Sequence, residues 1–403
     1  MTHEADADLV VPPFAPRSFF LLSIMLIFVY EFTCAAQSGE RLDSLRIEGW
    51  PMLSAVVEDI KRIPGVEVQS LLNEDLFPTD QGPHFHRIEP ATEVERFREL
   101  AAQADHTLVI APEFDDILAE RCQWVGEVGG RLLGPSAASI RLTADKYALG
   151  QHLQSNGVPT PDCFLPTPGF LTSIPRQEKQ ISNIEQGITK VEVSGTSKFD
   201  IPCSTFDISS SSPLTGGVSK FPLVLKPRFG AGSLETFLIQ GPVDRPGFQD
   251  EGRRKDMIVQ RFVAGQPASV AILIGSNQRL AMPAASQVLS ADGRFHYLGG
   301  CIPLPEKLTV RAHRLACQAI ESVPGFHGYV GVDLVLGSSP DGSEDWVIEI
   351  NPRLTTSYIG LRALAESNLA EAMLNIAGGK EVEPLKWRQG TVHFHSDGRV
   401  IRR

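Results

Sequence analysis

The stretch GYVGVDLVLGSSPDGSEDWVIEINPRLTTSYIGL, residues 328–361, contains two apolar segments joined by a turn. It predicts a strand at 331–336, a turn rich in Gly, Ser and Asp, and a second strand at 346–350. Because side chains alternate along a strand, Asp333 faces away from its apolar neighbours, and Glu349 shares a face with Asn351. These three side chains can therefore converge as oxygen ligands on one side of a hairpin.

Oxygen ligands of this kind suit Mg²⁺, which keeps one or two carboxylates and takes its other ligands from phosphates and water. The simpler alternative is an ordinary hairpin whose acids face solvent. Lys226 favours a nucleotide site, because it ends the apolar part of FPLVLKPRFGAGS, residues 221–233. The glycine-rich loop Gly230 to Ser233 comes next, and its backbone N–H groups can cover phosphates.

Residues 256–275, DMIVQRFVAGQPASVAILIG, predict two strands on either side of a polar hinge. The chain thus contains, in order, a strand that ends in lysine, a glycine-rich loop, two hinge strands, and a strand pair with Asp and Glu-x-Asn. This order resembles the ATP-grasp superfamily of ligases. The resemblance runs from about residue 141 to 374 and is sharpest at Glu349-Ile350-Asn351-Pro352-Arg353. It implies two α+β subdomains that hold ATP between them. It also implies a reaction in which a carboxylate becomes an acyl phosphate before an amine attacks it.

The resemblance assigns binding roles to residues in four groups. These are Lys146 and Lys226 at the ATP phosphates, Gly230, Gly232 and Ser233 in the covering loop, Gln260, Arg261 and Val263 at the adenine, and Asp333, Glu349 and Asn351 at Mg²⁺ or, alternatively, Mn²⁺.

Arg353 and Lys226 are the catalytic candidates. The planar fork of Arg353 suits a substrate carboxylate or the acyl phosphate. Thr355 and Thr356 follow it and are either hydroxyl donors in the site or N-caps of a helix.

The ribose position departs from the pattern of many superfamily members, which have an acid a few residues after the hinge. Pro267 stands at this place, so ribose contact is expected from Gln266 or Ser269.

The first part of the chain alternates strands with helices, which predicts a small doubly wound α/β domain with a parallel sheet. The predicted elements are a strand at 23–30, a helix from 48 to Pro64, a strand at 66–72, a helix at 94–102, and a strand that ends at Glu113. Ligands of such domains lie beyond the carboxyl ends of strands, where Glu31 and Glu113 fall. Each acid can equally be a loop or helix-cap residue.

The predicted domains are an extension at 1–16, an N-terminal (pre-ATP-grasp) α/β domain at 17–140, and an ATP-grasp domain at 141–403 with a flexible insertion at about 168–220. The apolar segment 18–30 also resembles the core of a signal peptide. We favour a buried strand, because the chain continues as an α/β domain.

The composition sets further expectations. A net charge of −11 over 403 residues argues against a nucleic-acid surface. Six scattered cysteines without a C-x-x-C pair predict reduced thiols in a cytoplasmic protein. No membrane partner is expected, because the apolar segment 18–30 is too short to span a bilayer comfortably. A homodimer is compatible with the sequence.

A narrower resemblance covers most of the chain. LIFVYEF, HTLVIAPEFDDIL and INPRLTTSYIGLR occur in the order and context of the ligases that join glutamate to tyramine in methanofuran biosynthesis. It implies glutamate, through its γ-carboxyl, and tyramine or tyrosine as substrates. Three alternatives stay open: another ATP-grasp ligase of amino acids and amines, a catalytically silent nucleotide-binding regulator, and a secreted or membrane-attached protein.

Overall fold

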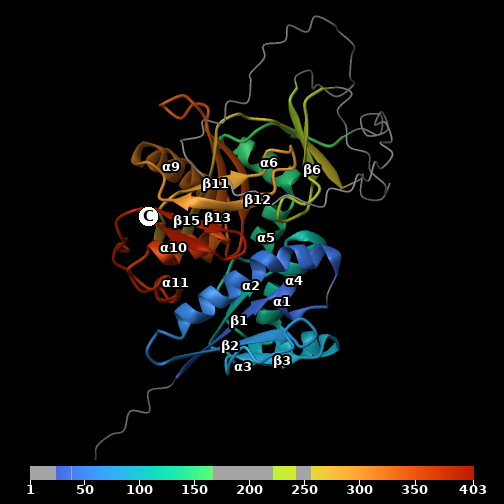
Figure 1. Cartoon of the computed structure of the whole chain (residues 1–403), viewed down its shortest axis with the longest axis vertical. Coiled ribbons are helices and arrows are strands. Elements are labelled where there is room, and N and C mark those ends of the chain that lie inside the picture. Colours follow the sequence, from blue (N-terminus) through green and yellow to red (C-terminus); the bar gives the residue numbers. More distant parts are fainter. Residues whose placement is uncertain (1–23, 38, 167–220, 242–255) are drawn as a thin grey trace, which may run out of the picture.

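The computed structural model describes residues 24–37, 39–166, 221–241 and 256–403. The expected extension at 1–16, the insertion at 168–220 and the start of the apolar segment 18–30 lie outside these residues. In the described part, the strands form an N-terminal sheet, a central sheet and a small sheet (Figure 1).

The N-terminal sheet is parallel and has the strand order β3-β2-β1-β4. Its elements are β1 (Met25–Glu31), α1 (Phe32–Ala35), α2 (Glu40–Ile60), β2 (Val66–Asn73), β3 (Phe85–Ile88), η1 (Pro90–Thr92), α3 (Glu93–Gln103), β4 (His106–Ile110), η2 (Phe114–Asp116) and α4 (Ile117–Glu127).

Both faces of β1 are buried, which explains its uninterrupted apolar sequence. Ile27 and Val29 lie in the core that contains residues of α2, whereas Phe28 and Tyr30 lie in the core that contains residues of α3. The predicted strand is thus confirmed for residues 25–31.

The central sheet is antiparallel, with the order β14-β13-β9-β11-β12-β15-β16 and β10 paired to β9. The small sheet has the order β5-β8-β6-β7. The remaining elements are α5 (Ala137–Ala144), α6 (Lys146–Ser155), β5 (Cys163–Phe164), β6 (Leu223–Pro227), β7 (Phe237–Ile239), β8 (Met257–Arg261), β9 (Gln266–Ile274), β10 (Arg279–Ala281), β11 (Ala285–Leu289), β12 (Tyr297–Ile302), α9 (Glu306–Ser322), β13 (Gly328–Leu336), β14 (Trp346–Asn351), α10 (Ser357–Leu364), α11 (Leu369–Ala377), β15 (Val392–His395) and β16 (Val400–Arg402).

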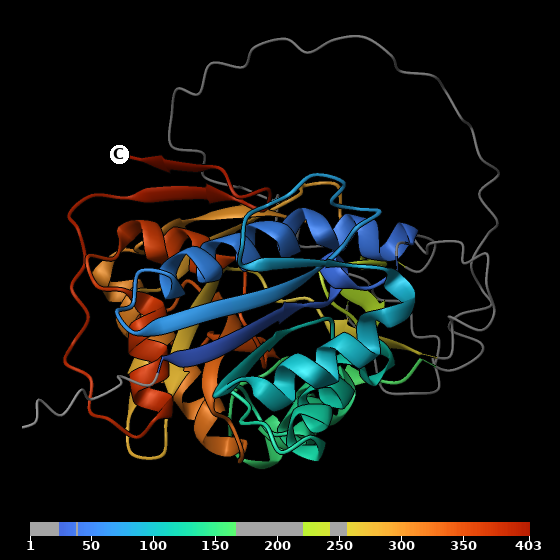
Figure 2. The same ribbon diagram turned by 90° about the horizontal axis from the view of Figure 1, so that it is seen from below.

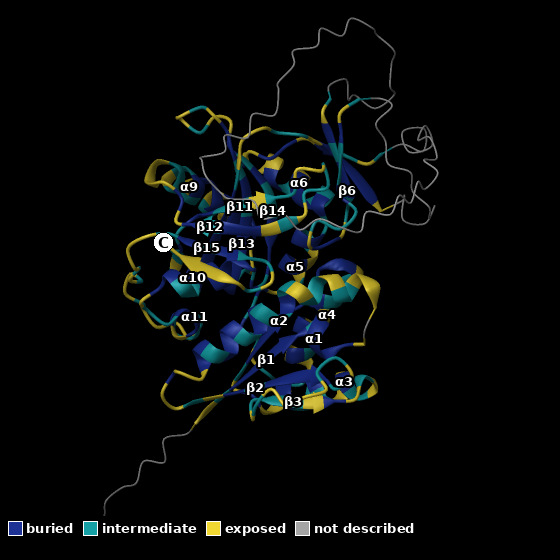
Figure 3. Cartoon of the chain, viewed as in Figure 1, coloured by how far each residue is buried: buried dark blue, intermediate teal, exposed yellow. Residues whose placement is uncertain are grey.

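Helices cover both faces of the central sheet. On β9, Val270 and Ile272 share a core with α9, whereas Ala271 and Leu273 share a core with α10, α11 and α2. Figure 3 shows the strands in the middle of the sheet as largely buried, as this arrangement requires.

Some elements differ from the sequence predictions. Helix α2 begins at Glu40 and not near Glu48, and it contains Pro51. Helix α10 ends at Leu364, and Asn368 caps α11 by accepting hydrogen bonds from two backbone N–H groups of its first turn. None of the helices in the described residues is long and apolar enough to cross a bilayer.

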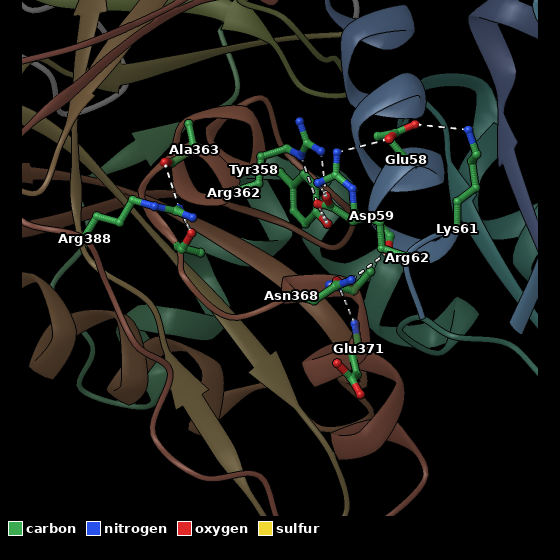
Figure 4. Close-up of polar contacts among 12 residues, drawn as sticks. Glu58, Asp59, Lys61, Arg62, Tyr358, Arg362, Ala363, Asn368, Glu371 and Arg388 are labelled. Carbon is green, nitrogen blue, oxygen red and sulfur yellow. Dashed lines mark hydrogen bonds and ion pairs between the residues drawn. The ribbon is translucent and has the colours of Figure 1, made fainter. Parts of the chain in front are cut away.

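Helix α2 joins the two halves of the molecule, since it lies between the N-terminal sheet and helices α10 and α11 (Figures 1 and 2). Its Asp59 is buried and accepts hydrogen bonds from Tyr358 Oη at 2.7 Å and Arg362 Nε at 2.9 Å. The backbone carbonyl of Asp59 accepts from Asn368 Nδ2 at 2.7 Å (Figure 4). The side chain of Asp59 therefore holds α10, and its backbone carbonyl holds Asn368 at the start of α11.

We predict that Asp59→Asn lowers the free energy of unfolding by roughly 2 kcal/mol, because Arg362 and Tyr358 lose their shared carboxylate. The loss is limited because Arg362 is partly exposed to solvent, which screens its charge. The matched control is Glu58→Gln, which removes exposed ion pairs to Lys61 and Arg62 and should cost less than about 0.5 kcal/mol. Urea denaturation of both variants measures the difference. Equal losses would show that Asp59 does not join the two halves.

Candidate active site

The hairpin β13–β14 brings the three predicted oxygen ligands together. Asp333 lies opposite Glu349 in the strand register, and Gly331 lies opposite Asn351. Asn351 Nδ2 donates to Asp333 Oδ2 at 2.9 Å, and Gln287 Nε2 from β11 donates to Asp333 Oδ1 at 2.8 Å. Gln287 is not among the residues predicted from the sequence, because no motif connects it with the hairpin.

A β-bulge gives Glu349 its orientation. Asp333 pairs with Glu349 but Leu334 pairs with Val347, which leaves one extra residue on β14. The extra residue lets Val347 and Ile350 both enter the core shared with α9, although simple alternation would place them on opposite faces. Glu349 is then free to face the lysines.

Burial raises the pKa of Asp333 to about 7, and the nearby Glu349 carboxylate adds to this effect. Two carboxylates and a carboxamide oxygen match the hard ligands that Mg²⁺ prefers. No three His, Cys, Asp or Glu side chains gather as a metal-binding group anywhere in the described residues. An Mg²⁺ ion here would thus complete its coordination with phosphates and water.

Two lysines lie near this hairpin. Lys146, the first residue of α6, donates from Nζ to Glu349 Oε1 and to the backbone carbonyl of Gly230, each at 2.8 Å. Lys226 is buried, and burial lowers its pKa to about 8, although the charge of Glu349 opposes this shift. Burial alone would raise the pKa of Glu349, but the two lysines lower it. The arrangement concentrates positive charge where a polyphosphate would need it.

The glycine-rich loop connects β6 to β7 and is fixed at its base. Arg228 Nε donates to Asp145 Oδ1 at 2.7 Å, and the same Asp145 caps α6. Gly232 adopts φ +67°, and a Cβ atom there would lie 2.7 Å from Leu45 Cδ2 of α2. Glycine at position 232 therefore accommodates both the positive φ and the close approach to α2. Ser233 beside it also has a positive φ, of 55°.

The predicted adenine hinge lies at the end of β8. Gln260 is buried, Val263 is half-buried, and Arg261 places its guanidinium 4.7 Å from the ring centre of Trp346 on β14. The hinge thus contacts the strand that carries Glu349. Its contact with adenine stays a prediction.

The two ribose candidates differ in burial, and a contact with ribose stays a prediction for both. Ser269 is buried and lies opposite Asp333 in the β9–β13 register, and both side chains share one face of the sheet. Gln266 is exposed at the start of β9 and donates to the carbonyl of Pro267 at 3.0 Å.

Arg353 forms a bidentate ion pair with Glu113 of the N-terminal half, with Nε to Oε1 at 2.8 Å and Nη2 to Oε2 at 3.2 Å. This pair raises the pKa of Arg353 despite its burial. A substrate oxyanion would therefore have to share or replace Glu113. The role of Arg353 toward substrate stays a prediction.

Thr356 occupies the predicted N-cap position of α10, but its side chain makes no capping hydrogen bond. Its hydroxyl donates to Glu48 Oε2 of α2 at 2.6 Å. Thr355 Oγ1 instead contacts Ser357 Oγ at 2.8 Å and Tyr329 Oη at 3.1 Å.

A small cavity of about 40 Å³ lies where the glycine loop meets the carboxyl ends of β1 and β4. Its charged lining residues are Glu31, Glu48 and Arg353. Glu31 is among the residues predicted from the sequence, but Glu48 is not, because the predicted helix begins at Glu48 whereas α2 begins at Glu40. A larger open hollow of about 380 Å³ has Glu74, Asp75 and Glu89 in its lining and no basic side chain, so it does not suit a phosphate.

Comparison with known proteins agrees with this geometry. The pre-ATP-grasp 3 domain family model matches residues 66–140, and the ATP-grasp domain family model matches 143–357, which is more than half of the chain. The chain belongs to the ATP-grasp family. This confirms the predicted superfamily and fold class.

Two relatives are named tyramine–L-glutamate ligase. The protein from Methanocaldococcus jannaschii is 24% identical over 369 residues, which cover 90% of this chain and 92% of the relative. The protein from Methanocaldococcus fervens is 30% identical over 128 residues, which cover 32% of this chain and 40% of the relative. The prediction of a ligase is confirmed at the level of the family.

Solved structures share the fold. An ATP-grasp superfamily protein from Archaeoglobus fulgidus has a TM-score of 0.62 at 19% identity and covers 92% of each chain. Carboxyaminoimidazole ribonucleotide synthase from Aspergillus clavatus, complexed with ATP, has a TM-score of 0.62 at 16% identity, covering 93% of this chain and 82% of that one. L-amino acid ligase from Bacillus licheniformis has a TM-score of 0.57 at 15% identity, covering 92% of this chain and 79% of that one.

Proposed function

We propose that this protein is an ATP-dependent carboxylate–amine ligase that joins the γ-carboxyl group of glutamate to tyramine or tyrosine in the biosynthesis of a methanofuran-type cofactor. The observation that carries the reaction type is the pair of lysines, Lys146 and Lys226, beside the Asp333/Glu349 hairpin and under a glycine loop. The relative with 24% identity along 90% of the chain supports the choice of substrates.

In the proposed reaction, a glutamate carboxylate oxygen attacks the γ-phosphorus of ATP, and ADP leaves. The amine nitrogen then attacks the acyl carbon of the glutamyl phosphate, inorganic phosphate leaves, and the amine loses a proton. Lys146 and Lys226 offset the negative charge of the phosphates during transfer. Lys146 would exchange its contact with the Gly230 carbonyl for a phosphate oxygen.

Asp333, Glu349 and Asn351 would hold Mg²⁺, and Glu349 can do so through Oε2 while Oε1 stays with Lys146. Bound there, Mg²⁺ would supply further charge neutralisation at the phosphates. The glycine loop would exclude water, which otherwise hydrolyses an acyl phosphate. Gly232 already lies against α2, so the described loop closes the site from that side.

The first test is ADP release by the purified protein with Mg-ATP, glutamate and a panel of amines. We expect release that requires both glutamate and either tyramine or tyrosine, with the γ-glutamyl amide identified by mass spectrometry. Release with other pairs of substrates would keep the reaction type and change the pathway. ATP binding without release for any pair would favour a regulator.

We predict that Glu349→Gln lowers kcat/KM on the order of 100-fold or more, because a neutral amide neither offsets the lysines nor binds Mg²⁺ as a carboxylate does. Glu344→Gln is the matched control, since Glu344 is exposed in the turn of the same hairpin. Circular dichroism checks that both variants fold. Wild-type turnover in Glu349→Gln would contradict the metal assignment.

We predict proton uptake when ATP binds above pH 8. Lys226 has a pKa of about 8 in the free protein, so its amine is largely neutral at about pH 8.5, and adjacent phosphates would raise this pKa again. The affinity for ATP should thus fall as the pH rises through 8. At lower pH Lys226 is already protonated and does not make the affinity depend on pH.

Calorimetry at about pH 8.5 in two buffers with different ionisation enthalpies measures this uptake, expected to approach roughly half a proton or more per ATP. Lys226→Met should abolish it, whereas Lys307→Met at the exposed start of α9 should not. Equal uptake in the two variants would exclude Lys226 as the group that is protonated.

A further inference from the structure

The cavity beside Arg353 contains charges of both signs. Its lining joins Arg353 and Gly232 of the ATP-grasp half to Glu31 and Glu48 of the N-terminal half. Arg353 is already neutralised by Glu113 through two hydrogen bonds. The other two carboxylates of the lining therefore lack a comparable partner.

Glu31 has an unused carboxylate oxygen. The side chain is only 2% exposed, and its hydrogen bonds from Thr33 Oγ1 at 2.8 Å and Cys34 N at 2.7 Å both reach Oε2. Oε1 accepts none from the described residues, and no lysine or arginine among them forms an ion pair with Glu31. Burial raises the pKa of this group, although hydrogen bonds from the side chains and backbone of Cys34 and Thr33 oppose the shift. A buried carboxylate without an ion-pair partner is stabilised when a cation binds next to it.

Glu48 is the second carboxylate of the cavity. Thr356 Oγ1 donates to its Oε2 at 2.6 Å, and no ion pair to Glu48 occurs in the described part of the chain. Burial raises its pKa, and Thr356 and the more distant charge of Arg353 oppose this shift. Leu45 and Met52 lie one turn before and after Glu48 on α2, and they add apolar walls to the same cavity.

Gly49 explains how α2 comes so close to the end of β1. A Cβ atom at this position would lie 2.7 Å from the carboxylate of Glu31. Only glycine lets the helix place Glu48 at the cavity beside Glu31. The two carboxylates thus belong to one site.

We propose that Glu31 and Glu48 bind the ammonium group of the acceptor amine, with Leu45 and Met52 in contact with the carbon atoms next to it. This subsite rests on the ligase function proposed above. Two carboxylates with apolar walls suit a primary alkylammonium ion. Arg353 in the same lining disfavours a divalent metal ion. The subsite places the nitrogen next to the side chain expected to hold the activated carboxylate, and one of the two carboxylates takes a proton from the ammonium group before the nitrogen attacks.

The test compares tyramine with two probes that do not carry its charge. Hydroxylamine is uncharged near neutral pH and traps glutamyl phosphate as a hydroxamate without needing an ammonium subsite. Tyrosol, which has a hydroxyl group in place of the ammonium group of tyramine, serves as a competitive inhibitor. The variants are Glu31→Gln and Glu48→Gln, and the control is Glu58→Gln on the exposed face of α2.

We expect each test variant to raise the KM for tyramine about tenfold or more and to lower the ratio of amide to hydroxamate by a similar factor. The binding preference for tyramine over tyrosol should shrink by the same factor, which a purely structural role would not cause. Glu58→Gln should behave as the wild type does. Hydroxamate formation also shows that a variant has folded, and Glu48 is the less buried of the two sites.

Unchanged KM and unchanged preference in both variants would overturn the subsite. Equal losses of amide and hydroxamate would also overturn it, because they would assign these acids to folding or to activation of glutamate. If the wild-type protein forms neither product from glutamate, the ligase function itself is wrong, and the subsite is overturned with it.

Discussion

The burial of two lysines beside one carboxylate is the constraint on which the rest of the site depends. Removing an ammonium ion from water costs several kcal/mol unless partners replace the lost hydration. Lys146 has such partners in Glu349 and the Gly230 carbonyl, whereas Lys226 makes no hydrogen bond in the described residues and has a pKa of about 8. The free protein therefore holds a cation that is incompletely neutralised, and a polyphosphate would correct this imbalance.

The same lysine contact connects three parts of the chain. Lys146 begins α6, Glu349 belongs to β14, and Gly230 belongs to the loop after β6. Asp145, the residue before Lys146, caps α6 and also holds Arg228 at the base of the loop. The neighbouring residues Asp145 and Lys146 thus connect the start of α6 to the glycine loop and to the hairpin. These hydrogen bonds hold the Lys146 side chain in place.

The sequence predicted those features that depend on local pattern. Alternation placed Asp333 away from its apolar neighbours, and β13 has this arrangement, because Val332 and Leu334 share the core with α9. The uninterrupted apolar run of β1 predicted a buried strand. The bulge on β14, the pairing of Arg353 with Glu113, and the role of Glu48 could not be predicted. The pairing of Arg353 and the role of Glu48 depend on contacts between segments far apart in the chain, and the bulge depends on the register of one hairpin. A single sequence gives no periodic signal for either.

The contacts between the two halves also divide the charges of the site. On the ATP-grasp side, cations face the place proposed for phosphates; on the N-terminal side, Glu31, Glu48 and Glu113 lie at strand ends and on α2. Arg353 lies between the two groups and, among the carboxylates of the described residues, forms an ion pair only with Glu113. These opposite charges favour an anionic substrate group on the ATP-grasp side and a cationic substrate group on the N-terminal side. The N-terminal sheet thereby contributes to recognition, since the acids at its edge cannot serve a phosphate and are suited to an amine.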